Sequence, residues 1–353
     1  MIGKVYEMSQ IGILGAGTWG IALARMLANS EHDVTVWSAL GQEIDQLEKN
    51  RIHPKLPGVS IPVEVGFTKS IEDVCKDKDI LIFAVPSVYI RATAVQSLPY
   101  VRTGQIVVSV AKGIERETLF TMTEVIEDVF RKEKPGTSVR LVALSGPTHA
   151  EEVALDMPTA IVSACEDIST AEKVQDIFMN TCMRVYTNPD IKGAELCGAL
   201  KNIIALASGI LTGLGYGDNT RAALITRGLA EITRLGVAMG CLEQTFYGLT
   251  GIGDLIVTAT SMHSRNNCCG QYIGQGMTTK GAVEKVGMVV EGINAIPAAM
   301  ELMKKYDVDM PIIKAVNLVV NYGKSARETV NQLMLREKKN ELRGQSELEY
   351  LNI

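Results

Sequence analysis

Lys201 is the only charged residue within residues 196–211, and an isolated lysine of this kind is a candidate for acid–base chemistry. Two interpretations are open. The side chain can bury its stem and keep its ammonium in water. Alternatively, it can lie in a cleft, where desolvation lowers its pKa toward neutrality and lets it exchange a proton with a carbinol or carbonyl oxygen. Asn202 and the small residues nearby favour the cleft, because they indicate a helix packed tightly against a neighbour or a ligand.

A second group of polar residues that can bind a ligand lies further along the chain. Residues 251–255 hold a single acid, Asp254, in a glycine-rich segment that predicts a flexible turn. Residues 260–267 then combine hydroxyl, guanidinium and amide groups just before a helix expected over 267–273. Such a loop can bind a phosphate through Arg265 and the N–H groups of the helix. An ordinary polar loop between helices has a similar composition, so both interpretations stay open.

Lys112 and the loop at residues 145–150 each follow a stretch that predicts a strand, over 106–110 and 141–144. Ligands bind at the carboxyl ends of strands in open parallel sheets. Lys112 is therefore expected to face an anionic substrate, although a lysine after a strand can also be a solvated loop residue. The glycine, hydroxyl and amides of the loop can hold a polar ligand. His149 in this loop is a possible acid–base, although a lone histidine in a loop is more often incidental.

Residues 15–20, GAGTWG, fit the pattern G-x-G-x-x-G between an expected strand over 11–14 and an expected helix over 18–28. In this context the glycines permit a tight turn, a close approach of the backbone to a pyrophosphate, and close packing of helix on strand, in the order Gly15, Gly17, Gly20. The start of the helix adds N–H groups and a positive dipole. The motif predicts dinucleotide binding; the alternative is a glycine-rich turn without a ligand.

The end of the second strand usually shows which nicotinamide cofactor is bound. An acidic residue there receives the ribose of NAD, and an arginine receives the 2′-phosphate of NADP. The strand expected over 34–37 runs instead into Ser38, Ala39 and Leu40. Glu43 lies nearby but is expected in the following helix. The choice between NAD and NADP therefore stays open.

The first half of the chain alternates strand-like and helix-like segments, which predicts an α/β fold with a doubly wound parallel sheet. Six strands are expected, over residues 11–14, 34–37, 80–85, 106–110, 141–144 and 159–163. Helical periods follow, over about residues 192–211, 220–239, 245–249, 281–285, 292–306 and 311–322. We therefore predict two closely packed domains: a dinucleotide-binding domain over residues 1–190 and an all-helical domain over 191–353. The polar tail after Leu335 is expected to be frayed.

Composition narrows the class of protein. The chain has 353 residues, 46% of them hydrophobic, and a formal net charge of −5, which disfavours nucleic acid as a partner. The seven cysteines have no disulfide-like spacing, which indicates a reducing compartment, and no ligand spacing for a metal is evident. No signal peptide and no apolar run of about 18 residues is recognised.

Arg227 and Glu231, four residues apart, can form an ion pair in their helix.

Taken together, these residues resemble the NAD(P)-dependent sn-glycerol-3-phosphate dehydrogenases of the bacterial type. The similarity runs over about residues 11–324. The glycine loop GAGTWGIALA is followed in family order by LPGV, AVPS, AKGIE and SGPTHAEEVA. Residues 198–236, beginning GALKNIIALASGILTGLGYGDNTRAALITRGLAE, are close to the family's helical hairpin, and GLTGIGDLIVTATSMHSRN, VVEGINA and MPI complete the match.

The resemblance implies a Rossmann-like N-terminal domain and an all-helical C-terminal domain with the active site between them. It implies reversible hydride transfer between the nicotinamide C4 and C2 of the substrate, the pair being dihydroxyacetone phosphate and sn-glycerol 3-phosphate. Lys201 matches the family's catalytic lysine, and Asp254 would orient it. The matching substrate-binding positions are Lys112, Gly146, Thr148, Lys201, Asp254, Ser264, Arg265 and Asn266. The cofactor-binding positions, the three loop glycines included, are Gly15, Gly17, Thr18, Trp19, Gly20, Lys112, Ala150, Arg265, Val289 and Glu291.

The chain also departs from the family pattern. A basic residue often follows the tryptophan of the second strand, where a 2′-phosphate would lie, but residues 38–40 are Ser, Ala and Leu, which puts a preference for NADP in doubt. A tyrosine usual before the LPG of residues 56–58 is absent, and His149 stands where phenylalanine is usual. By analogy we expect a cytoplasmic homodimer without an integral membrane segment or bound metal, acting on a small phosphate compound and supplying glycerophospholipid synthesis.

Two other interpretations remain. A β-hydroxyacid dehydrogenase or a ketopantoate reductase also pairs a Rossmann domain with a helical domain and a catalytic lysine, but the Ser264–Arg265–Asn266 loop favours a phosphate-bearing substrate. A non-catalytic NAD(H) sensor would keep the glycine loop. It would have no need for Lys112, Lys201, Asp254 and Arg265 together.

Overall fold

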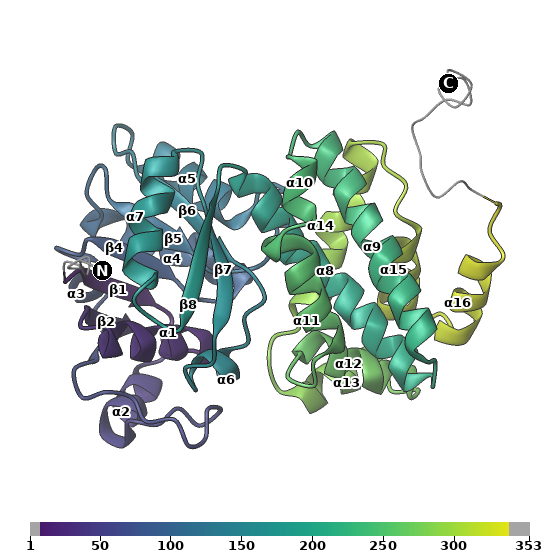
Figure 1. Ribbon diagram of the computed structural model, residues 1–353, viewed down its shortest axis with the longest axis horizontal. Coiled ribbons are helices and arrows are strands. Elements are labelled where there is room, and N and C mark those ends of the chain that lie inside the picture. The colour runs from purple at the N-terminus through teal and green to yellow at the C-terminus, as the bar shows by residue number, and fades with distance from the viewer. Residues whose placement is uncertain (1–7, 339–353) are drawn as a thin grey trace, which may run out of the picture.

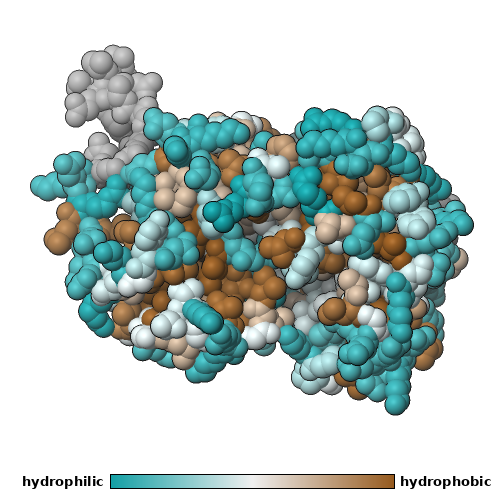
Figure 2. All heavy atoms as spheres, turned by 180° about the vertical axis from the view of Figure 1, so that it is seen from behind, coloured by the Kyte–Doolittle hydropathy of each residue, from teal (hydrophilic) through white to brown (hydrophobic). Residues whose placement is uncertain are grey.

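A computed structural model describes residues 8–338 of the chain. The N-terminal part is built around a β-sheet flanked by helices, and the C-terminal part is helical (Figure 1). The long helix α8 (Ile191–Gly213) begins beside the sheet and runs through the middle of the helical part. Seen from behind, apolar residues gather near the middle of the surface, mainly on the helical half (Figure 2).

Eight strands form one sheet in the order β3-β2-β1-β4-β5-β6-β7-β8. Their bounds are β1 Gln10–Leu14, β2 Asp33–Trp37, β3 Gly66–Thr68, β4 Ile80–Phe83, β5 Ile106–Ser109, β6 Arg140–Ser145, β7 Thr159–Ala164 and β8 Met183–Asn188. The predicted doubly wound sheet is confirmed, and all six expected strands are present. The strands β3 and β8 at the two edges were not predicted from sequence. β3 has only three residues, whereas β8 begins with an alternation of buried and exposed positions that is typical of an edge strand and was missed.

The sheet is not wholly parallel, because β7 runs antiparallel to β6, with Ser145 opposite Val162. The expectation of an all-parallel sheet is wrong at this pair. A parallel crossover needs a covering helix of useful length, and the connection between these strands carries only the four-residue helix α6 (Ala150–Val153). The chain resumes the parallel direction from β7 to β8.

Both faces of the sheet are covered, which explains why the central strand β4 is apolar and buried at every position. On one face Ile80 and Ile82 of β4 join a buried cluster with α1 (Thr18–Asn29) and α7 (Ile168–Phe178). On the other face Leu81 and Phe83 join α4 (Ile90–Ser97) and α5 (Met122–Glu133). Residues of one strand thus alternate between two cores. The flank near β2 carries α2 (Gly41–Asn50) and α3 (Ile71–Cys75).

The helical part packs around α8. Its other helices are α9 Asp218–Ala238, α10 Glu243–Phe246, α11 Asp254–Thr260, α12 Arg265–Gly274, α13 Thr279–Val286, α14 Glu291–Lys305, α15 Pro311–Tyr322 and α16 Ala326–Met334. By length and composition α8 could cross a membrane, but 89% of its apolar window is buried inside the protein. It is therefore the core helix of this half.

Small residues on α8 let α12 approach closely, as the sequence predicted. A Cβ on Gly209 would lie 2.0 Å from the carbonyl oxygen of Asn267, and one on Gly270 would lie 2.1 Å from that of Leu206. No side chain larger than hydrogen fits at either position without moving the backbone. The contact brings the start of α12, with the predicted phosphate-binding loop, against the helix that carries Lys201.

Several local expectations in the helical half need correction. The helix expected over 245–249 is replaced by the short α10 and a π-helical turn, Leu249–Gly253, and α11 and α16 were not anticipated. The predicted flexible turn at residues 251–255 is wrong, since this segment is helical throughout. Glu231 does not pair with Arg227 but accepts hydrogen bonds from the backbone N–H groups of Ile312 and Ile313.

The polypeptide passes from β8, which ends at Asn188, directly into α8 at Ile191. The division into domains at residue 190 remains a prediction. Most of the tail predicted to be frayed lies outside the described residues. All seven cysteines lie among the described residues, and each is a free thiol.

Candidate active site

Asp254 lies between the two lysines singled out from the sequence. Its Oδ2 is 2.6 Å from Nζ of Lys112, and its Oδ1 accepts a hydrogen bond from Nζ of Lys201. The three side chains come from different elements: Lys112 from the loop after β5, Lys201 from the middle of α8, and Asp254 from the first residue of α11. The structure thus brings together, at the carboxyl edge of the sheet, groups that are up to 142 residues apart in sequence.

Lys201 is buried, with 4% of its surface exposed, and Asp254 is wholly buried. The snorkelling alternative is therefore wrong. Burial lowers the pKa of Lys201 to about 7, even though the carboxylate of Asp254 acts to raise it; the positive charge of Lys112 lowers it further. An amine with this pKa holds and releases a proton readily near neutral pH, as an acid–base group must.

The position of Asp254 depends on the π-helical turn that leads into α11. At Gly251 a Cβ would lie 1.9 Å from the carbonyl oxygen of Phe246, so the tight turn requires glycine there. Such π-helical turns are frequent at functional sites because they redirect a side chain within a helix. One turn after Asp254, Thr258 accepts a second hydrogen bond from Nζ of Lys201.

Lys112 is held from three sides. Its Nζ donates to the carbonyl oxygen of Gly146, at 3.1 Å, as well as to Asp254. Its stem passes the backbone of α8 at Gly198, where a Cβ would lie 3.4 Å from Cγ of Lys112. Thr148 donates from its hydroxyl to the same Gly146 oxygen, at 3.2 Å. The loop after β6 is thereby joined to the lysines, as the sequence predicted.

Asn266 belongs to a chain of amides that links three helices. Its Nδ2 donates to Oδ1 of Asn202, at 2.9 Å, and its Oδ1 accepts from the N–H of Gly292, at 2.8 Å. Asn202 in turn donates to the carbonyl oxygen of Gly198, at 3.1 Å. Asn266, which was predicted to hold substrate, is thus hydrogen-bonded within the protein, and its partner Asn202 directly follows Lys201 on α8.

The other two members of the predicted phosphate loop have different surroundings. Ser264 is the N-cap of α12, and its buried hydroxyl accepts from the N–H of Asn267, at 3.2 Å. Arg265 is the first residue of α12 and is exposed; its guanidinium forms no hydrogen bond or ion pair with another described residue. Arg265 is therefore the member of the loop that is free to bind an anion.

The glycine loop has the geometry expected of a dinucleotide-binding turn. Gly15 has a φ of +126°, and a Cβ there would lie 2.7 Å from the carbonyl carbon of Ala84. A Cβ on Gly20 would lie 2.0 Å from the oxygen of Gly15, so the helix packs directly on the turn. Gly17 is the N-cap of α1 and faces open space, and no side chain caps this helix. These residues fit a pyrophosphate placed against the N–H groups of α1.

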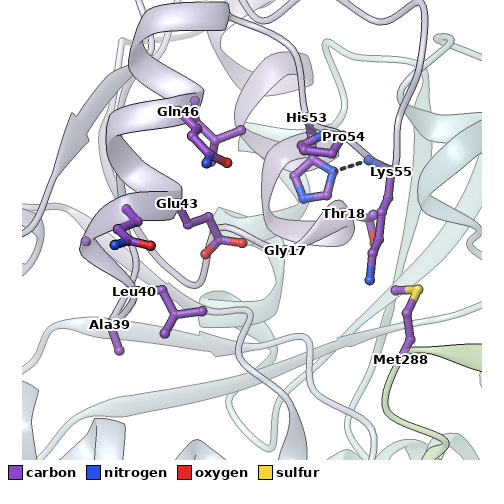
Figure 3. A pocket seen from close by; sticks show the side chains of 13 residues that line it. Gly17, Thr18, Ala39, Leu40, Glu43, Gln46, His53, Pro54, Lys55 and Met288 are labelled. Carbon is purple, nitrogen blue, oxygen red and sulfur yellow. Dashed lines mark hydrogen bonds between the residues drawn. The ribbon is translucent and has the colours of Figure 1, made fainter. Parts of the chain in front are cut away.

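A cavity of about 560 Å³ extends from this turn. Gly17 and Thr18 form one end of it, the start of α2 with Glu43 one wall, and residues 53–55 with Met288 the opposite wall (Figure 3). Met288 comes from the helical half of the chain. The cavity is therefore bounded by both halves and leads away from the glycine loop along the end of β2.

Glu291 and Val289 were predicted to bind the cofactor. Glu291 contacts a residue that follows β4, and Val289 lies next to the cavity wall. Glu291, the first residue of α14, accepts hydrogen bonds from the N–H and the hydroxyl of Ser87, at 3.1 and 2.7 Å. Ser87 follows β4, so this contact joins the two halves of the chain. Val289 is half-buried, next to Met288 of the cavity wall.

Ala150 and Trp19 contribute to the apolar packing of the N-terminal half: Ala150 is buried, and Trp19 is partly buried. Ala150 is buried in the cluster behind the sheet, and Trp19 packs against that cluster. No hydrogen bond joins either side chain to Lys112 or Lys201 among the described residues.

His149, which the sequence left unexplained, is half-buried, and its ring centroid is 5.9 Å from that of His263. Burial lowers its pKa, and the charge of Lys201 lowers it further, so the ring is neutral at neutral pH. Its Nε2 has no hydrogen-bond partner among the described residues. His149 thus feels the charge of Lys201, but no hydrogen bond between its ring and the lysine cluster is present among the described residues.

The sequence did not reveal two contacts, one of Lys201 with Thr258 and one of Glu291 with Ser87. Thr258 binds Lys201 and stands four residues after Asp254, a spacing that places both on one side of a helix. This signal was not read because the segment was predicted to be a turn. Glu291 was expected near the cofactor, whereas its bond to Ser87 depends on how the two halves pack and leaves no trace in the sequence. The described residues hold no group of three or more metal-binding side chains.

Comparison with known proteins places the chain among dehydrogenases. Residues 10–171 match the family model for the N-terminus of NAD-dependent glycerol-3-phosphate dehydrogenase, and residues 190–331 match the model for its C-terminus. The chain is 64% identical to glycerol-3-phosphate dehydrogenase [NAD(P)+] 2 of Lactobacillus delbrueckii subsp. bulgaricus over 335 residues, covering 95% of this chain and 99% of the relative. It is 53% identical to the enzyme of Agathobacter rectalis, with 94% and 97% covered. The crystal structure of glycerol-3-phosphate dehydrogenase from Coxiella burnetii superimposes with a TM-score of 0.87 at 32% identity, covering 93% of this chain and 99% of that one.

Proposed function

The chain belongs to the family of NAD-dependent glycerol-3-phosphate dehydrogenases, and we propose that Lys201 is the acid–base group of its reaction. The protein is an NAD(P)-dependent oxidoreductase that interconverts dihydroxyacetone phosphate and sn-glycerol 3-phosphate. The observation that carries the proposal is the buried ammonium of Lys201, held by Asp254 and Thr258 at the carboxyl edge of the sheet.

The nicotinamide cofactor, when bound, supplies the hydride to C2 of the ketone in reduction and accepts it in oxidation. The residues of this chain have to manage the accompanying proton. In reduction the ammonium of Lys201 donates a proton to the carbonyl oxygen, so that one hydride and one proton complete the alcohol. In oxidation the neutral amine takes the hydroxyl proton. Because burial brings its pKa to about 7, both forms of Lys201 are populated near neutral pH.

Asp254 fixes the direction of the Lys201 amine and keeps Lys112 beside it. While Lys201 is protonated, as reduction requires, the two lysines and one carboxylate leave this cluster one positive charge in excess, in surroundings where burial strengthens electrostatic interactions. That charge favours an anionic substrate and stabilises negative charge that develops on the carbonyl oxygen. Gly146 and Thr148, joined to Lys112, form the polar edge of the substrate position.

The substrate phosphate is assigned to the start of α12. Arg265 offers an unpaired guanidinium, and the first turn of a ten-residue helix adds its positive end. Ser264 and Asn266 support this position, since both are held by the hydrogen bonds described above. Binding of a phosphate remote from C2 supplies energy for orienting the reacting carbon.

The cofactor is assigned to the glycine loop and the adjoining cavity. Gly15, Gly17 and Gly20 shape the turn at α1. Thr18 and Trp19 follow it, and Met288 of the cavity wall leads to Val289 and Glu291 on the opposite side. Lys112, Ala150 and Arg265 complete the proposed set. The family resemblance supports these positions, and the open space beside Gly17 is the structural feature that fits a pyrophosphate.

Wider roles follow by analogy with the family. We propose that the enzyme is a cytoplasmic homodimer of two-domain subunits, divided near residue 190, and that its product supplies glycerophospholipid synthesis. The seven free thiols support a reducing compartment.

The test is the change in nicotinamide absorbance when purified protein is mixed with dihydroxyacetone phosphate and NADH or NADPH. Lys201→Arg keeps a cation in the pocket but cannot release its proton, and Lys201→Ala removes the group. Both should reduce turnover by at least about 100-fold, while Lys173→Ala, an exposed lysine on α7, should have no effect. Cofactor binding, followed by fluorescence, should persist in Lys201→Arg and would show that this variant is folded.

Turnover of Lys201→Arg at the rate of the parent would exclude Lys201 as the acid–base. Absence of any turnover by the parent, with cofactor still bound, would favour the alternative of a sensor. Oxidation of NAD(P)H with carboxylate ketones alone would favour a β-hydroxyacid dehydrogenase or a ketopantoate reductase.

A further inference from the structure

Ser38 and Glu43 form a fixed pair at the end of β2. The hydroxyl of Ser38 donates to Oε2 of Glu43 at 2.6 Å, and Oγ of Ser38 accepts a hydrogen bond from the N–H of Leu40 at 3.1 Å. Ser38 is buried, and Glu43 stands in the first turn of α2, where the positive end of the helix stabilises a carboxylate. The carboxylate is therefore held in one place by a short hydrogen bond and a helix terminus.

The carboxylate of Glu43 faces the cavity that starts at the glycine loop. Glu43 is one of the residues lining that cavity, and Figure 3 shows its side chain directed into the space between α2 and the segment that carries His53 and Lys55. Its Oε1 accepts no hydrogen bond from another residue that the structure describes. One oxygen is thus bound to Ser38, and the other is available to a ligand.

The position of this carboxylate matches the place where the ribose of a dinucleotide lies. In βαβ dinucleotide-binding folds the pyrophosphate sits at the first helix, and the group at the end of the second strand meets the ribose 2′-position. Here Gly17 and Thr18 mark one end of the cavity and Ala39 and Leu40 mark the end of β2. The residue directly after β2 is a serine, but it holds a carboxylate that comes from five residues further on.

We propose that Glu43, positioned by Ser38, selects NADH over NADPH by accepting a hydrogen bond from the 2′-hydroxyl of NADH and repelling the 2′-phosphate of NADPH. This inference deepens the proposed function, since it rests on cofactor binding at the glycine loop. It assigns the preference that neither the sequence nor the relatives' names resolve.

The cations near Glu43 do not provide an alternative phosphate site. Lys55 lies on the opposite side of the cavity, with its Nζ 3.4 Å from the carbonyl oxygen of Gly287. Burial lowers the pKa of His53, so this ring is neutral at neutral pH. Lys69, whose stem lies beside Gly41, is paired with Asp45 at 2.6 Å. No arginine lines the cavity among the described residues.

The experiment measures cofactor binding directly, by fluorescence titration of the purified full-length protein with NADH and NADPH in the absence of substrate. The protein should bind NADH at least about tenfold more tightly, because like charges brought together are strongly unfavourable. Glu43→Gln removes the charge but keeps the shape, and should reduce this ratio mainly by tightening NADPH binding. Glu48→Gln removes an exposed charge from the same helix, outside the cavity, and should leave the ratio unchanged.

Ser38→Ala tests the positioning role separately. It keeps the charge of Glu43 but frees the carboxylate, so the ratio should fall between the values of the parent and of Glu43→Gln. A ratio equal to that of the parent would show that Ser38 does not position Glu43.

The inference would be overturned if the parent bound NADPH as tightly as NADH, or if Glu43→Gln changed both affinities equally. Turnover of dihydroxyacetone phosphate with both cofactors would in that case leave the proposed function intact. If the protein bound NADH preferentially but did not turn over dihydroxyacetone phosphate, the role of Glu43 would hold. The proposed reaction would then be wrong.

Discussion

Lys201 of α8 donates a hydrogen bond to Asp254 of α11, 53 residues away, and both side chains are buried. The same carboxylate binds Lys112 through its other oxygen. Because Asp254 raises the pKa of Lys201 and Lys112 lowers it, the proton affinity of Lys201 depends on all three groups together. The consequences can be measured through the pH dependence of the reaction.

Reduction should fall and oxidation should rise as the pH passes through about 7. The reduction needs protonated Lys201, whose pKa burial lowers to about 7, and oxidation needs the neutral amine. Profiles of kcat against pH in both directions would show this. In Asp254→Asn the carboxylate that raises this pKa is lost, so the fall in reduction should move to lower pH and kcat should drop by about 100-fold. An unchanged profile in this variant would exclude the coupling; Asp218→Asn, an exposed position, is the control.

Removing the guanidinium of Arg265 should weaken substrate binding. A charged hydrogen bond contributes about 1.5–3 kcal/mol, so Arg265→Ala should raise KM for dihydroxyacetone phosphate by roughly 10- to 100-fold. KM for a ketone that lacks the phosphate should not change. The exposed Arg116→Ala provides a control on general charge effects. Equal losses with both ketones would mean that Arg265 does not bind the phosphate.

Glu231 should make the stability of the protein depend on pH. Burial raises the pKa of its carboxyl to about 7 in the folded state, against 4.5 as its ordinary value. The folded state therefore holds more protons than the unfolded state between these values, and stability falls as the pH rises from about 4.5 to 7. Glu231→Gln removes this dependence and should be more stable than the parent at pH 8, by about 2 kcal/mol.

Thermal unfolding between pH 5 and 8 would test this expectation. The Tm of the parent should decrease more steeply with pH than that of Glu231→Gln, while Glu301→Gln, an exposed position on α14, should follow the parent. Parallel curves for the parent and Glu231→Gln would show that the ionisation of Glu231 is not linked to folding.

The close contact of α8 and α12 should tolerate no added methyl group. A Cβ on Gly270 would lie 2.1 Å from the oxygen of Leu206 and 2.8 Å from the backbone nitrogen of Ile210. Gly270→Ala should therefore destabilise the fold by about 2 kcal/mol or more, as overpacking does. Gly217→Ala meets no atom within 4 Å and should be close to neutral. The free energies of unfolding of the two variants can be compared by denaturant titration. Equal values would mean that α8 and α12 can move apart without loss of stability.

The amino-acid sequence determined much of the fold and the identity of the main groups. The glycine loop, the apolar strands of the sheet centre and the helical second half are local patterns, and local patterns are set by the backbone and by hydrophobic periodicity. For the same reason Lys201 stood out, since a charge inside an apolar helix violates the pattern around it. Short edge strands such as β3 and the π-helical turn before Asp254 carry too few residues to form a pattern.

The tertiary structure decided what these groups touch. The sequence left open whether Lys201 reaches water, and only the packing of α8 against α11 and α12 shows that it is buried. The sequence placed Glu43 near the end of β2. The hydrogen bond from Ser38 to Glu43, however, depends on how the start of α2 folds back toward that strand. Glu231 was expected to pair along its own helix and instead caps α15, 81 residues away. Contacts of this kind join segments that are far apart in the sequence. The local sequence pattern does not encode how close such segments lie in space, because that depends on the packing of the whole core.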